Sequence, residues 1–162
     1  MRESFGRGER IVLDVEGEES IVSVDRETGS LNLTLEIQDL PISVSQRQKA
    51  LGILEILCGS LTPKFAWSDR DGEYPKGLVK SVTDTSLNWI FWCNFYGPAY
   101  IKKYGLDFFL HAPFASARTF AQQGVRCLTT AAPGEPATAV LRNLRDYFAH
   151  SGIDILLYDS LN

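Results

Sequence analysis

The sequence is poor in the residues and motifs that most often bind metals and cofactors. It contains two histidines and three cysteines in 162 residues, with no H-E-x-x-H or C-x-x-C spacing. Structural and catalytic zinc sites need histidine and cysteine ligands at such spacings. Neither G-x-x-x-x-G-K-[ST] nor G-x-G-x-x-G occurs, and these are the usual phosphate-binding loops. We therefore expect no metal and no cofactor.

Long apolar runs and a cysteine framework are also missing. The longest nearly uncharged run, residues 87–101, is too short to span a bilayer, and residues 1–10 lack the apolar core of a signal peptide. The cysteines are odd in number, widely spaced and placed in apolar segments, where cysteine behaves as a small hydrophobe. They are Cys58, Cys93 and Cys127. These features predict a cytoplasmic protein without a membrane span or disulfides.

The chain has the composition of a globular protein with an uneven charge distribution. Apolar residues make up 44% and charged residues 22%, and the net charge is −4. Residues 1–40 carry ten acidic and four basic residues, whereas residues 41–162 carry ten acidic and twelve basic ones. Nucleic-acid binding requires a cluster or row of basic side chains to contact the phosphates, so we expect no nucleic-acid partner. The acidic segment fits either a solvated strand face or a basic protein partner.

Hydrophobic periodicity predicts β-structure at the N-terminus and a helix after it. Residues 1–8 read as a loose lead-in, residues 9–17 as a short strand, and residues 20–38 as a hairpin that turns near Gly29. In the hairpin, apolar residues alternate with polar ones, which predicts one solvated face. Residues 43–61 then have the 3.6-residue periodicity of a helix, which Gly59 and Pro63 end.

Strands and helices follow each other in the remaining sequence. Residues 64–70 read as a strand, and the aromatic run 87–95 as a central strand with an apolar odd face from Leu87 to Phe95. Short helices at 98–104 and 106–112, a hairpin at 114–131, a helix at 136–151 and a final short strand complete the chain. Because strands come in adjacent pairs, we expect a single α+β domain over residues 1–162. Its sheet is largely antiparallel, with helices packed mainly on one face.

Aromatic and acidic residues around the predicted central strand form the candidate binding site. Tryptophan and tyrosine beside an acidic loop are typical of protein-binding hot spots, although half-buried packing is the other interpretation. The loop after the strand at 64–70 is rich in acidic residues, and the even face of the aromatic run is mixed. The predicted partner-binding residues are Trp67, Asp69, Asp71, Glu73, Trp92, Asn94 and Tyr96.

Two other functions stay open from the residues alone. The first is a small-molecule-binding enzyme with a cleft near His111, Asn94 and Tyr96, to which Asp69 could contribute. A Cys127–His111 pair is conceivable, but a structural thiol is the simpler interpretation. The second is an oligomeric component whose aromatic residues form a homodimer face. No nucleophile motif is present, so we expect no catalytic residues.

The segment "NWIFWCNFYGPAYIKKYGLDFFLHAP" resembles small bacterial proteins grouped with polymorphic-toxin immunity proteins of the immunity protein 52 type. An aromatic strand leads into a helix with a tyrosine, an aliphatic residue, a lysine and a glycine, followed by a leucine and a proline. The matching residues are Tyr100, Ile101, Lys103, Gly105, Leu110 and Pro113, and the resemblance extends over about residues 63–150. It implies a cytoplasmic α+β protein without catalytic residues that protects its producer by binding a cognate toxin.

Overall fold

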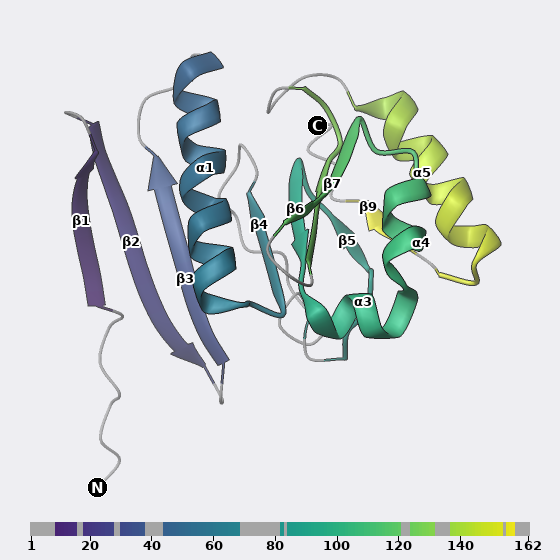
Figure 1. The fold of residues 1–162 in the computed structure, drawn as a ribbon, viewed down its shortest axis with the longest axis horizontal. Coiled ribbons are helices and arrows are strands. Elements are labelled where there is room, and N and C mark those ends of the chain that lie inside the picture. The colour runs from purple at the N-terminus through teal and green to yellow at the C-terminus, as the bar shows by residue number, and fades with distance from the viewer. Residues whose placement is uncertain are drawn as a thin grey trace, which may run out of the picture. The chain divides into compact units, whose positions relative to one another are not determined.

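The computed structural model describes residues 9–15, 18–27, 30–37, 44–68, 82, 84–120, 124–131, 137–153 and 155–157. The chain divides into two compact units, Met1–Ser43 and Val44–Asn162. The first contains a three-stranded sheet and the second contains the helices and the other strands (Figure 1). The single domain expected over residues 1–162 stays a prediction.

The first unit is an antiparallel sheet in the order β1-β2-β3. Its strands are β1 Glu9–Val15, β2 Glu18–Glu27 and β3 Ser30–Ile37. Only residues 16–17 and 28–29 separate consecutive strands, as in tight hairpins. The predicted strand at 9–17 and hairpin at 20–38 are therefore confirmed.

The register of this sheet places most of its apolar residues on one face. Residues directly opposite each other in an antiparallel pair lie on the same face. Ile11 is opposite Val22, and Val22 is opposite Leu35, so all three share one face. The same register places nine apolar residues on that face: Ile11, Leu13, Val15, Val22, Val24, Leu31, Leu33, Leu35 and Ile37. Period two in the sequence thus corresponds to a one-sided sheet.

The second unit is built on an antiparallel sheet in the order β4-β6-β8-β7. Its strands are β4 Phe65–Ser68, β6 Cys93–Tyr96, β7 Ser116–Phe120 and β8 Gly124–Leu128. A separate parallel pair joins β5 Trp89–Ile90 to β9 Leu156–Leu157. The helices are α1 Val44–Leu61, α3 Pro98–Tyr104, α4 Leu106–His111 and α5 Thr138–His150.

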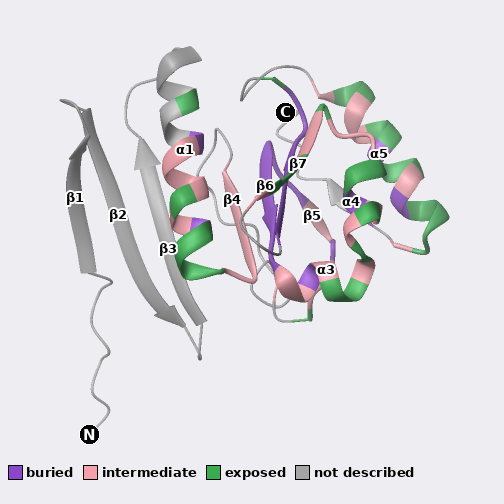
Figure 2. Ribbon diagram, viewed as in Figure 1, coloured by how far each residue is buried: buried purple, intermediate pink, exposed green. Residues whose placement is uncertain are grey.

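Helices cover both faces of this sheet. On one face, Tyr96, Val125 and Cys127 pack with buried residues of three helices: Tyr100 of α3, Phe109 of α4, and Leu144 and Phe148 of α5. On the other face, Cys93, Phe95 and Leu128 pack against Leu51 and Cys58 of α1. Figure 2 shows the buried residues concentrated along β6 and β8, with exposed residues on the outer turns of the helices. The predicted α+β class is confirmed: three helices share one face, and α1 lies on the opposite one.

The run at residues 87–95 is not the single central strand that its composition predicts. It forms β5 and β6, which belong to different sheets, and the chain leaves the ladder at Phe91 and Trp92. Asn94 accounts for this break. Its Oδ1 accepts from the Phe91 N–H at 3.0 Å, and its Nδ2 donates to the Phe91 carbonyl at 2.8 Å. A side chain therefore satisfies the backbone groups that a neighbouring strand would otherwise pair.

The break also overturns the predicted alternation of this run. Leu87 packs with α3, α4 and α5, whereas Cys93 and Phe95 pack against α1. The odd-numbered residues therefore do not share a face. β6 itself does occupy a central position, since it pairs with β4 on one side and β8 on the other.

Gly97 joins β6 to α3 at a close backbone approach. A Cβ at this position would lie 2.0 Å from the Pro63 carbonyl oxygen, which no side chain tolerates. The Gly97 N–H also donates to the Lys64 carbonyl at 3.0 Å. Pro98 follows at the start of α3, where its missing N–H costs nothing. The turn between the central strand and the helix thus depends on glycine for steric reasons.

Candidate functional site

The predicted site around Trp67 is only partly visible. Asp69, Asp71 and Glu73 lie outside the described residues. Trp67 is half-buried on β4, an edge strand of its sheet, and its ring stacks on Phe91 with 4.2 Å between the centroids. Its indole therefore contributes to packing, and the partner-binding role of this segment stays a prediction.

The structure corrects the predicted role of Trp92, Asn94 and Tyr96. Asn94 and Tyr96 have no exposed surface, and Trp92 is 8% exposed. The Trp92 indole donates to the Thr130 carbonyl at 3.2 Å, and the Tyr96 ring stacks on Phe109 at 4.5 Å. Burial raises the pKa of Tyr96 well above its ordinary value, and its hydroxyl has no hydrogen-bond partner. The three side chains organise the core and offer no surface to a partner.

The alternative catalytic residues His111 and Cys127 differ in exposure. His111 is exposed at the end of α4, with Nδ1 2.8 Å from the Asp107 carbonyl of its own helix. Cys127 is fully buried on β8, and burial raises the pKa of its thiol, which favours the unreactive protonated form. The Cys127–His111 pair and the cleft near His111, Asn94 and Tyr96 stay predictions.

The second face of the β1–β3 sheet is acidic. The register places five acidic residues on it, with Arg10 as its only basic residue among those of the three strands: Asp14, Glu19, Asp25, Glu27 and Glu36. The nine apolar residues lie on the opposite face, together with Glu9, Glu18 and Arg26. The sequence predicted an acidic N-terminal segment, and the register places five of its acidic residues on one face of the sheet, here called the acidic face.

Two register pairs give the acidic face its pattern. Asp14 lies directly opposite Glu19, and like charges directly opposite destabilise a sheet. Val12 lies directly opposite Ile21, so an apolar pair sits among the acidic residues. An apolar centre within a polar rim is the usual anatomy of a protein–protein interface. A cationic partner would relieve the repulsion between the two carboxylates.

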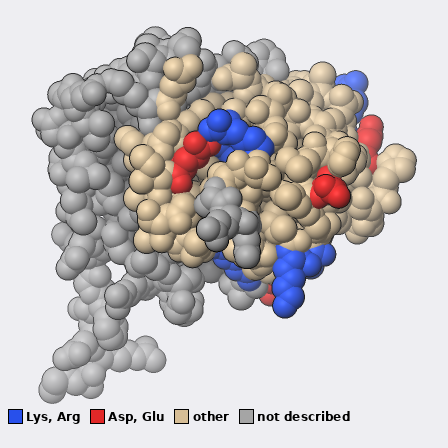
Figure 3. Space-filling model, in the orientation of Figure 1, with Lys and Arg blue, Asp and Glu red and all other residues tan. Residues whose placement is uncertain are grey.

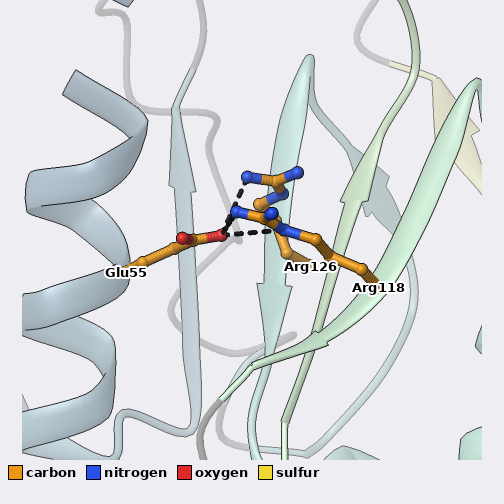
Figure 4. Close-up of polar contacts among 3 residues, drawn as sticks. All are labelled: Glu55, Arg118 and Arg126. Atoms are coloured by element: carbon orange, nitrogen blue, oxygen red, sulfur yellow. Dashed lines mark hydrogen bonds and ion pairs between the residues drawn. The ribbon is translucent and has the colours of Figure 1, made fainter. Parts of the chain in front are cut away.

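A second charged feature lies inside the Val44–Asn162 unit. Glu55 of α1 binds two arginines of the sheet, Arg118 on β7 and Arg126 on β8 (Figure 4). Glu55 Oε1 accepts from Arg126 Nη1 at 2.8 Å, from Arg118 Nε at 3.1 Å, and also from Arg118 Nη2. The arginines are directly opposite each other in the β7–β8 ladder. This Glu55–Arg118–Arg126 cluster joins α1 to the sheet.

Exposure differs strongly within this cluster. The side chain of Arg118 is 54% exposed, that of Glu55 25% and that of Arg126 only 8%. In Figure 3 acidic and basic atoms meet on the surface between α1 and β7, in an otherwise largely uncharged part of the described surface. The cluster therefore opens to solvent through Arg118 and reaches into the unit at Arg126.

One feature of the sequence points to this cluster, but hydrophobic periodicity alone does not reveal it. "GVRCL" has a charged residue in an apolar strand, and alternation assigns Arg126 to the face opposite Val125 and Cys127. A one-sided sheet would place that face in water. Here α1 covers it, so Arg126 becomes buried and needs Glu55. Glu55 comes from a helix far away in the sequence, and sequence spacing cannot indicate such a contact.

No described helix has the length and apolarity to cross a membrane. Within the described ranges, histidine, cysteine and acidic side chains form no group of three or more that could hold a metal ion.

Comparisons with known proteins do not place the chain in a family. No protein-family model, no curated protein and no solved structure matches it. The resemblance to immunity proteins accordingly stays a prediction.

Proposed function

We propose that the protein acts by binding another protein rather than by catalysis, and that its partner presents a basic surface to the acidic face of the β1–β3 sheet. The observation that carries this proposal is the register, which gathers five acidic residues on one face. The apolar pair Val12–Ile21 among these carboxylates supports it further.

The sharpest form of the proposal is an immunity protein that neutralises a cognate bacterial toxin. The resemblance over about residues 63–150 supports this form, and the acidic face suits a basic toxin domain. The three cysteines are buried thiols, which fits a reducing compartment such as the bacterial cytoplasm. Protection would then come from physical obstruction of the toxin.

The test is co-expression and co-purification with the product of the neighbouring gene, followed by binding kinetics and a toxicity assay. The key variant reverses three charges of β2 on the acidic face: Glu19→Lys, Asp25→Lys and Glu27→Lys. We expect its association rate constant to fall by about tenfold or more at low salt, because electrostatic attraction accelerates association. Protection from toxicity should weaken in parallel.

The matched control reverses the same number of charges on exposed residues of the second unit. It carries Asp84→Lys, Asp107→Lys and Asp146→Lys, so its net charge equals that of the key variant. The control should bind as the wild type does. The absence of any complex with the neighbouring gene's product would contradict the immunity form, and equal losses in both variants would contradict a role for the acidic face.

A further inference from the structure

Arg126 is a buried cation without full compensation. It lies on β8, whose five residues are all buried, and the whole residue is 7% exposed. Its Nη1 binds Glu55, but its Nε–H is buried and has no hydrogen-bond partner. An unpaired buried donor of a charged group is costly, so native structures usually supply an acceptor.

Arg118 doubles the positive charge at the same place. It is directly opposite Arg126, and both side chains converge on a single oxygen, Glu55 Oε1 (Figure 4). One carboxylate therefore faces two guanidinium groups, and the formal charge of the cluster is positive. Both arginines bind Glu55 through Oε1, so they share one acceptor atom, whereas a carboxylate can offer both of its oxygens to a guanidinium group.

We propose that the Arg118–Arg126 pair is a binding site for a small oxyanion, a phosphate or a carboxylate group, and that Glu55 is its internal competitor. Guanidinium groups bind both kinds of oxyanion through parallel N–H donors. The Nε–H of Arg126 supplies an unused donor, and the 54% exposed side chain of Arg118 supplies access from solvent. An incoming oxyanion takes over donors that now converge on Glu55 Oε1 and neutralises the excess charge.

The experiment is a titration of the 15N-labelled full-length protein, followed by NMR at the arginine Nε–H signals. Inorganic phosphate and acetate are the two probes, in separate series at constant ionic strength set with sodium chloride. We expect saturable shifts at Arg118 and Arg126 Nε–H, and the tighter probe identifies the class of oxyanion. The Nε–H of Arg126 should respond most, because it gains its first acceptor.

Three variants separate a binding site from a structural ion pair. Glu55→Gln removes the competing charge, and we expect the oxyanion to bind about tenfold more tightly, as the site gains one positive charge. Arg118→Gln should weaken binding by about tenfold or more, since one charged donor fork is lost. Arg142→Gln, at an exposed arginine of α5, is the matched control and should leave the dissociation constant unchanged.

A purely structural cluster would give the opposite pattern. Glu55→Gln would then lower the midpoint of thermal unfolding without any gain in oxyanion affinity. Non-saturable shifts in the wild type, or equal weakening by Arg118→Gln and Arg142→Gln, would overturn the proposal. If Glu55→Gln does not fold, the wild type, Arg118→Gln and Arg142→Gln still decide the question, because Arg118 is largely exposed.

Discussion

The β1–β3 sheet and the β4-β6-β8-β7 sheet differ in what lies on their two faces. In the first, the register gives one mainly apolar face and one face that carries five acidic residues. In the second, helices cover both faces, and every residue of β6 and β8 is buried. Each polar residue that is buried on β6 or β8 therefore needs a specific partner. Asn94 and Arg126 are the residues that show this requirement.

The largest expected effect tests the doubly covered sheet at Phe109. Phe109 is fully buried on α4 and stacks on Tyr96 of β6. Phe109→Ala should lower the free energy of unfolding by about 3–5 kcal/mol, because it removes apolar contacts and leaves a cavity. Urea unfolding followed by circular dichroism measures the change.

The adjacent residue provides the control for Phe109. Leu110 is 37% exposed on the same helix, so Leu110→Ala should cost clearly less. Similar losses in both variants would show that α4 does not pack on the sheet as described.

The next largest effect tests how this sheet accommodates a polar residue. Asn94→Ala removes both hydrogen bonds to the Phe91 backbone and leaves those groups buried. We expect a loss of about 2–3 kcal/mol in the free energy of unfolding, which is the usual cost of unsatisfied buried polar groups. Asn88→Ala, at a half-buried residue just before β5, serves as the control. An unchanged stability of Asn94→Ala would mean that Asn94 does not hold the break between β5 and β6.

An intermediate effect concerns alkaline pH. Burial, with Glu55 adding to it, raises the pKa of Cys58 from 9.0 to about 12, and burial also raises the pKa of Cys127 and Tyr100. The folded state thus holds these protons more tightly than the unfolded state. Their contribution to stability is complete below pH 9.0 and is lost as the pH rises toward about 12. Urea midpoints at stepped pH should fall in that window.

Cys58→Ala isolates one part of this alkaline loss. The variant should be less stable than the wild type at neutral pH, because alanine fills less of the buried site than cysteine. Its urea midpoint should fall less steeply above pH 9.0, because the Cys58 thiol is gone. If the urea midpoint of the variant fell with pH as steeply as that of the wild type, Cys58 would not contribute to the alkaline loss of stability. The β1–β3 sheet contains no cysteine or tyrosine, so the loss of stability in this pH range comes from the second sheet and its helices.

The smallest expected effect tests the one-sided sheet. Glu19→Lys replaces a like-charge pair with an opposite-charge pair at Asp14. We expect the unit to gain about 0.2–1 kcal/mol in the free energy of unfolding, which is the range for cross-strand pairs. Glu19→Gln should gain less, because it only removes the repulsion. A loss of stability in Glu19→Lys, measured by thermal unfolding at low salt, would contradict the register.

Sequence periodicity correctly predicted those elements whose structure depends on residues close together in the chain. The alternation from Leu31 to Ile37, the helices around Tyr100 and Leu144, and the β7–β8 hairpin are all confirmed. These elements depend on local spacing, turn residues and short-range pairing. Glycine and proline marked their ends correctly, as at Gly105 between α3 and α4.

The remaining features depend on contacts between distant segments. Periodicity cannot indicate that α1 covers one face of the second sheet, so it could not predict that Arg126 is buried against Glu55. It also cannot distinguish a continuous apolar strand from two short ones, because the hydrogen bonds of the Asn94 side chain decide the matter. Three predicted site residues, Trp92, Asn94 and Tyr96, were placed on a surface for the same reason, whereas they fill a core with two covered faces.

The parallel pair β5–β9 has a consequence for the order of folding. Trp89 pairs with Leu156, which lies far along the chain, whereas the strands of the β7–β8 hairpin are separated by only three residues. Closing a long loop costs more entropy than closing a short one, so distant pairs form late. We therefore expect the hairpin to form early in refolding and β9 to dock on β5 last. In hydrogen exchange of the native protein, β9 should be among the first elements of the second unit to open.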